Sequence, residues 1–148
     1  MKRENIKGLN TEALAYMGDA VYEKFIREKL LAGGMARVNN LHRVATGYVR
    51  AGAQAEAIRL MFEELSEEEQ RLVKRARNHK FNSKAKNVDS ITYKWATAFE
   101  TLVGYLYLAD KEERLTEVMN RAVEIIEGEG ECQTKAKRKK QETNQRAG

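Results

Sequence analysis

The chain has 148 residues, of which 42% are hydrophobic and 33% are charged, and it contains no proline. This is the composition of a soluble globular protein, and it predicts one all-α domain with a sizeable core. The first ten residues lack the apolar segment of a signal peptide, and no apolar run is long enough to cross a bilayer. The single cysteine, Cys132, can form no internal disulfide. We therefore expect a cytoplasmic protein.

The net charge of +5 is unevenly distributed along the chain. Residues 132–148 carry six bases and one acid, whereas the other 131 residues hold 21 bases and 21 acids. Bulk charge therefore does not mark the body of the chain as a nucleic-acid binder. The segment from Arg71 to Lys86, however, contains seven bases and no acid. Such a single-sign cluster within a neutral body indicates a nucleic-acid contact surface.

Helical periodicity and capping signals divide the chain into six predicted helices. Their expected ranges are Asn10 or Thr11 to Leu31, 36–47, 49–65, Ser66 to Asn78, Asp89 or Ser90 to Ala109, and 110–127. Ser66 and Glu69 have the spacing of a capping box. The polar stretch 79–88 lacks helical periodicity and is predicted to be a loop. We expect a helical domain over residues 1–128 and a basic, disordered tail over 129–148.

Two acids, Asp19 and Glu100, lie on otherwise uncharged stripes of their predicted helices. Glu23, by contrast, has Arg27 four residues later and is expected to form an ordinary exposed salt bridge. A carboxylate on an apolar face needs a partner, because burying a lone charge is strongly unfavourable. Either each acid bonds a buried donor or a base, or both acids face one polar pocket. Two carboxylates that leave room for water and a substrate oxygen suit Mg²⁺, which beside a basic cluster indicates phosphodiester chemistry.

Two segments resemble conserved motifs of the ribonuclease III family. "ALAYMGDAVYE" resembles the signature segment of that family, and "ATAFETLVGYLYL" resembles its second acidic helix, in the expected order. The resemblance covers residues 9–127. "LHRVATGYVRAGAQA", "RARNHK" and the short length further resemble the bacterial form that lacks a double-stranded-RNA-binding domain. The resemblance implies the all-α ribonuclease III endonuclease fold over residues 1–128, working as a homodimer with an RNA-binding valley across its two-fold axis.

The resemblance also implies roles for individual residues. Asp19 and Glu100 match the acids of the two motifs, which implies that they are the catalytic and Mg²⁺-binding residues. Two further acids used by full-length family members are replaced by Ala15 and Thr97, so the metal site is expected to be completed by water. Gly18 is expected to allow close approach of a neighbouring helix.

The activity implied is an Mg²⁺-dependent endoribonuclease that cleaves double-stranded or structured RNA and leaves 5′-phosphate and 3′-hydroxyl ends. The implied substrate is the 23S ribosomal RNA precursor, with substrate choice depending on RNA shape or on a bound ribosomal protein. We expect the basic segment to contact RNA phosphates and 2′-hydroxyls. The RNA-binding residues predicted there are Arg75, Arg77, Asn78, Lys80, Lys84 and Lys86. The alternative is that they are solvated charges that balance the acids of residues 63–69.

Two other functions remain open from the sequence. Replacement of two family acids by Ala15 and Thr97 would suit an RNA-binding or scaffolding protein on the same fold that has lost cleavage, although Asp19 and Glu100 argue against it. A helical DNA-binding protein could use the segment from Arg71 to Lys86, but it would leave the two isolated acids unexplained. Comparing binding to RNA and to DNA tests the DNA-binding alternative, because contacts to 2′-hydroxyls would favour RNA.

Overall fold

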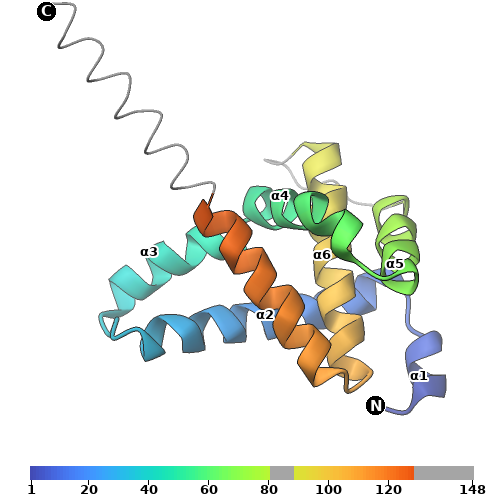
Figure 1. Cartoon of the computed structure of the whole chain (residues 1–148), viewed down its shortest axis with the longest axis horizontal. Coiled ribbons are helices and arrows are strands. Elements are labelled where there is room, and N and C mark those ends of the chain that lie inside the picture. Colours follow the sequence, from blue (N-terminus) through green and yellow to red (C-terminus); the bar gives the residue numbers. More distant parts are fainter. Residues whose placement is uncertain (81–88, 129–148) are drawn as a thin grey trace, which may run out of the picture.

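The computed structural model describes residues 1–80 and 89–128 (Figure 1). Over these ranges the chain forms helices and no strand, which confirms the all-α prediction. The elements are α1 (Arg3–Lys7), α2 (Thr11–Ala32), α3 (Val38–Val49), α4 (Ala51–Met61), the 3₁₀ helix η1 (Phe62–Glu64), α5 (Glu67–Arg77), α6 (Ser90–Leu108) and a last helix over 112–128. Within the described ranges, no helix is long and apolar enough to span a membrane.

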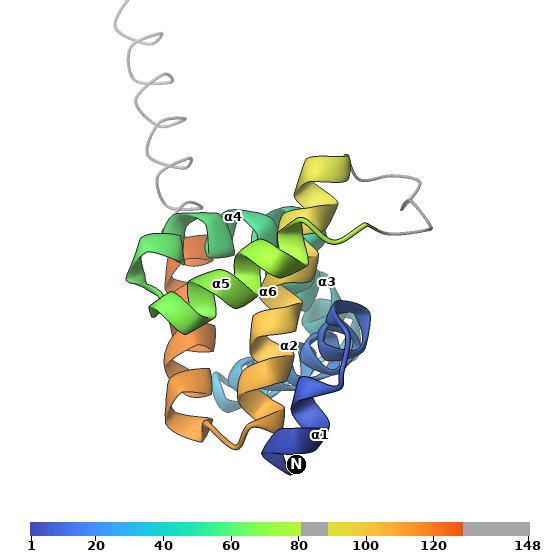
Figure 2. The same ribbon diagram turned by 90° about the vertical axis from the view of Figure 1, so that its right-hand side faces the viewer.

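Helix α6 is the central element, and it packs against α2, α4 and α5 (Figures 1 and 2). It can occupy the centre because its residues are apolar or small on nearly every face. Phe99 and Leu102 are fully buried in the core, where they join Tyr22 of α2 and Ile58 of α4. The ring of Tyr22 meets Phe99 edge-to-face at 4.8 Å between centroids.

Side-chain caps fix the starts of three helices as the sequence predicted. Asn10 accepts a hydrogen bond from the amide of Ala13, at 2.8 Å, to begin α2. The predicted capping box of Ser66 and Glu69 is present at the start of α5, with both reciprocal hydrogen bonds. Asp89 caps α6. Each cap satisfies an amide that has no partner within its own helix.

The structure differs from the predicted helices in two places. The expected helix over 49–65 is shorter, because extended backbone at Arg50 (φ −62°, ψ 150°) separates α3 from α4 and the last turn tightens into η1. Helix α1 was not predicted. It has five residues and buries only Ile6, so it leaves no periodic apolar pattern to detect.

The backbones of α2 and α6 touch where two glycines meet. A Cβ atom added to Gly18 would lie 1.7 Å from the carbonyl oxygen of Glu100, and one added to Gly104 would lie 1.9 Å from that of Leu14. Only glycine permits so close a crossing. The prediction for Gly18 is therefore confirmed. Since Asp19 and Glu100 adjoin the contact, this crossing positions both acids.

Candidate active site

The α2–α6 crossing brings Asp19 and Glu100 into one electrostatic environment. Asp19 is exposed and Glu100 is partly buried. Burial, and secondly the negative charge of Asp19, raise the pKa of Glu100 to about 8, although a hydrogen bond from Gln54 opposes the rise. Burial, and secondly Glu23, also raise the pKa of Asp19. Ionised Asp19 therefore disfavours the ionisation of Glu100.

Neither acid is neutralised by a base in the part of the chain that the structure describes. The predicted ion pair of Glu23 with Arg27 is present there, at 2.6 Å. None of the ion pairs among the described residues involves Asp19 or Glu100. Pairing with a base, one of the alternatives open from the sequence, is thus not found among these residues. The described ranges also hold no cluster of three or more acid, histidine or cysteine side chains suited to a metal. The crossing thus presents two carboxyl groups without a basic partner among the described residues.

Gln54 of α4 is a polar neighbour of this site that the sequence analysis missed. It is 1% exposed, and its side-chain amide donates a hydrogen bond of 2.9 Å to the carbonyl of Val49. Its Oε1 atom has no hydrogen-bond partner among the described residues. A signal was available, because Gln54 shares the apolar stripe of Ala57, Ile58 and Met61. A lone amide on a buried stripe needs an explanation in the same way as a lone carboxylate.

At positions 15 and 97, which the resemblance matches to two further acids of full-length ribonuclease III enzymes, this chain has no acid. Ala15 and Thr97 are both buried. The hydroxyl of Thr97 donates to the carbonyl of Tyr93, 2.9 Å away in its own helix. It is thus committed to local backbone bonding. Neither side chain adds a charged oxygen to the pair of carboxylates.

The predicted RNA-binding residues that can be located do not share one face. Arg75 is exposed and lines a pocket that also borders α1. The guanidinium of Arg77 lies 4.9 Å from the ring centroid of Trp95 on α6. Asn78, which follows α5, and Lys80 are exposed. The remaining two predicted residues, Lys84 and Lys86, lie outside the described residues.

Comparison with known proteins identifies the class to which this site belongs. Residues 12–111 match the family model described as "Ribonuclease III domain". The chain belongs to the ribonuclease III family, a class of endoribonucleases that act on RNA.

The chain is similar to Mini-ribonuclease 3 proteins over most of their length. It is 49% identical to the Mini-ribonuclease 3 of Brevibacillus brevis over 81% of this chain and 90% of that protein. It is 48% identical to the Mini-ribonuclease 3 of Symbiobacterium thermophilum, over 86% and 98% of the two chains. The crystal structure of protein FN1578 from Fusobacterium nucleatum superposes with a TM-score of 0.71 at 30% identity, covering 81% of this chain and 96% of that one. These matches confirm the family and the fold expected from the two acidic motifs.

Proposed function

We propose that the protein is an Mg²⁺-dependent endoribonuclease that hydrolyses double-stranded or structured RNA in the cytoplasm, with Asp19 and Glu100 as its catalytic and metal-binding residues. The observation that carries the proposal is the pair of carboxyl groups at the α2–α6 crossing that lack a basic partner among the described residues. We further propose that its substrate is the 23S ribosomal RNA precursor, alone or with a bound ribosomal protein. The high identity to Mini-ribonuclease 3 proteins supports a substrate shared with them.

The chemistry of the two side chains fits Mg²⁺. This ion prefers oxygen ligands, keeps several of its waters and is commonly held by one or two carboxylates. A bound cation would offset the repulsion between ionised Asp19 and ionised Glu100, which contributes to the raised pKa of Glu100. When bound, Mg²⁺ supplies positive charge that polarises a phosphate oxygen and makes water more acidic. Ala15 and Thr97 leave the rest of the coordination sphere to water and substrate.

The side chains of the site would bind the ion and position the groups that take part in phosphodiester hydrolysis. Asp19 and Glu100 would hold the ion through their carboxylates, and Gln54, whose side chain lowers the pKa of Glu100, would help to keep Glu100 ionised. Water adds to phosphorus as the bond to the 3′ oxygen breaks, and the leaving oxygen takes up a proton. The products then carry 5′-phosphate and 3′-hydroxyl ends.

RNA binding is proposed to involve two copies of residues 1–128. A homodimer supplies two sites, one for each strand of a duplex, and exposed apolar surface on α2 suits such an interface: Tyr16 is 83% exposed. Arg75, Arg77, Asn78 and Lys80, with Lys84 and Lys86 beyond the described residues, are proposed to contact RNA phosphates. The basic tail, residues 129–148, adds salt-sensitive, nonspecific affinity for RNA.

Cleavage of a long, perfectly paired RNA duplex tests the proposal. The wild-type protein should cut it with Mg²⁺ and lose activity in EDTA. Asp19→Asn and Glu100→Gln should each reduce cleavage by at least about a hundredfold. The matched control is Glu28→Gln, which removes an exposed carboxylate of the same helix that pairs with Lys24, and it should cut normally. Cleavage that survives Asp19→Asn would show that the active site lies elsewhere.

A second candidate function is RNA binding without cleavage, favoured by the apolar and hydroxyl side chains at positions 15 and 97. It predicts metal-independent duplex binding with no cut at any Mg²⁺ concentration. Parallel binding to DNA of the same sequence tests the DNA-binding alternative. Equal affinity for the two duplexes would favour that alternative, whereas preference for RNA would exclude it.

A further inference from the structure

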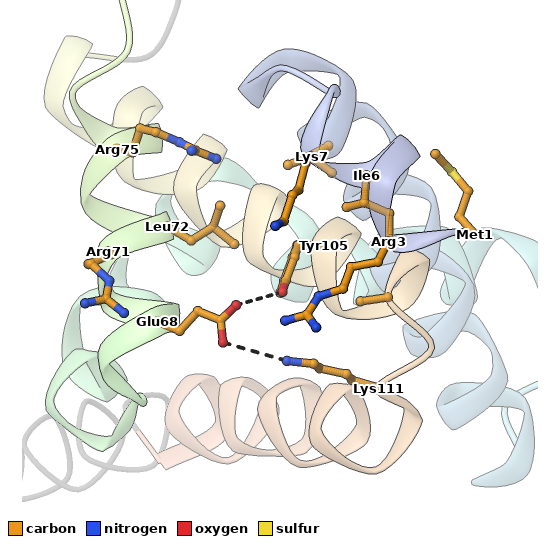
Figure 3. Close-up of a pocket in the computed structure, with 12 residues that line it drawn as sticks. Met1, Arg3, Ile6, Lys7, Glu68, Arg71, Leu72, Arg75, Tyr105 and Lys111 are labelled. Carbon is orange, nitrogen blue, oxygen red and sulfur yellow. Dashed lines mark hydrogen bonds and ion pairs between the residues drawn. The ribbon is translucent and has the colours of Figure 1, made fainter.

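A second concave site lies between α1, α5 and α6. It is a pocket of about 840 Å³ (Figure 3). Its lining residues are Met1, Arg3, Ile6, Lys7, Leu14, Glu68, Arg71, Leu72, Arg75, Tyr105, Ala109 and Lys111. They include neither of the two acids at the α2–α6 crossing nor Gln54. The volume lies within the range typical of small-molecule sites, and the proposed cleavage reaction does not use it.

Four cations line opposite walls of this pocket. Arg3 and Lys7 extend from α1, and Arg71 and Arg75 belong to α5 (Figure 3). All four are exposed, and none forms an ion pair within the part of the chain that the structure describes. Like charges held around one cavity repel each other, so an anion bound between the walls would relieve that repulsion. Arginine suits phosphate because its planar guanidinium can donate two parallel hydrogen bonds.

The one carboxylate of the pocket is already engaged. Glu68 accepts a hydrogen bond of 3.0 Å from the hydroxyl of Tyr105 and lies 4.0 Å from the ammonium group of Lys111 (Figure 3). These two contacts hold Glu68 against α6 and the start of the last helix. It therefore compensates Lys111 and leaves the other four cations available to a ligand.

Apolar side chains form part of the pocket lining. Ile6 and Leu14 are buried there, and Leu72 is partly buried. Phosphate alone gains no binding free energy from an apolar surface, whereas a nucleobase can bury a flat, largely apolar face against it. A lining that combines cations and apolar side chains therefore suits a ligand that carries both a phosphate and a base.

We propose that this pocket binds a nucleotide, with its phosphates between the cations of α1 and α5 and its base against the apolar lining residues Ile6, Leu14 and Leu72. The same chemistry is presented by a free nucleotide and by the 5′-phosphorylated end of single-stranded RNA. The pocket and the carboxylate pair share no residue, although Arg75 of the pocket is also among the residues proposed to contact RNA.

Binding is measured by fluorescence anisotropy with a fluorescently labelled GDP, in EDTA so that a metal held at Asp19 and Glu100 contributes nothing. Unlabelled GDP should displace the probe at least tenfold better than guanosine or pyrophosphate, because each of these lacks one half of the ligand. Added salt should weaken binding. A 5′-phosphorylated RNA hexamer and its 5′-hydroxyl counterpart identify the source: displacement by the former alone assigns an RNA end, and displacement by free nucleotides alone assigns a small ligand.

The double substitution Arg3→Gln and Arg71→Gln should weaken GDP binding at least tenfold, since it removes one cation from each wall. Both side chains are exposed, so the fold should persist. Arg43→Gln, which removes an exposed arginine of α3 outside the pocket, is the matched control and should bind normally. The proposal would be overturned if labelled GDP showed no binding at millimolar concentration. It would also be overturned if Arg43→Gln weakened GDP binding as much as the double substitution, or if pyrophosphate displaced the probe as well as GDP does.

Discussion

Glu100 carries an ionisation penalty in the folded protein that it does not carry when unfolded. The folded protein retains its proton to about pH 8, whereas an ordinary glutamate releases it near pH 4.5. The folded state therefore binds more protons through this interval, and the free energy of unfolding falls as pH rises across it. The contribution of protonated Glu100 is complete below about pH 4.5 and is lost as pH rises through about 8.

Glu100→Gln should accordingly be more stable than the wild type when Mg²⁺ is absent. We expect the advantage in unfolding free energy to grow by about 3 kcal/mol between pH 5 and pH 8, on the scale of about 1.4 kcal/mol per pKa unit. Urea denaturation in EDTA, at one protein concentration and several pH values, measures it. Glu28→Gln, on the exposed face of α2, should show no such trend. A pH-independent difference would mean that Glu100 ionises normally in the folded protein.

Gln54 is expected to act through Glu100. Gln54→Met keeps the length of the side chain but removes the hydrogen bond that lowers the pKa of Glu100. The pH at which cleavage reaches half of its maximum should rise by roughly half a unit to one unit. The unfolding free energy should fall by roughly 1 kcal/mol, because the substitution removes the hydrogen bond to the carbonyl of Val49 as well as the unpaired Oε1 atom. A lower rate with an unchanged pH profile would instead indicate a packing role for Gln54.

At the scale of helices, the crossing of α2 and α6 tolerates no side chain at Gly18. Gly18→Ala would place a methyl group against the backbone of Glu100. We expect a loss of roughly 1–3 kcal/mol in unfolding free energy as the helices separate. Cleavage should fall further than the folded fraction, because both carboxylates move. Stability and initial rates measured on one preparation distinguish the two effects.

Gly47→Ala supplies the control for that substitution. Gly47 lies within α3, and a Cβ atom added there would meet no atom within 4 Å. The change should stabilise the protein by roughly 0.5–1 kcal/mol through helix propensity alone and should leave cleavage unaltered. If both alanine variants behaved alike, the backbone contact at Gly18 would not be tight in solution.

The helices and the acid pair were predictable because their signals are local. Asn10, Ser66 and Asp89 are capping residues beside apolar periodicity, and Asp19 and Glu100 stand out on uncharged stripes. What could not be predicted depends on contacts between segments far apart in the chain. The position of Arg77 over Trp95 of α6, while Arg75 lines the pocket beside α1, depends on how α5 packs against its neighbours. The pocket against α1 requires a short helix whose only buried residue is one isoleucine.

At the scale of the whole molecule, the proposed homodimer requires an apolar surface, and α2 offers one beside the acid pair. Tyr16 is 83% exposed and lies two residues before Gly18. A tyrosine so placed is costly to leave in water and is typical of interface anchors. An interface there would bring the sites of the two subunits close together, as cutting both strands of a duplex requires.

Tyr16→Glu should therefore dissociate the dimer, because it would place two carboxylates near the two-fold axis. Sedimentation equilibrium should show monomers at concentrations where the wild-type protein is dimeric, and cleavage of both strands of a duplex should decline in parallel. Val38→Glu places the same charge at an apolar side chain of α3 that is 76% exposed, and it should leave association intact. If Val38→Glu dissociated the dimer and Tyr16→Glu did not, the interface would lie on α3. If both variants were monomeric and still cut both strands, one subunit would suffice for cleavage.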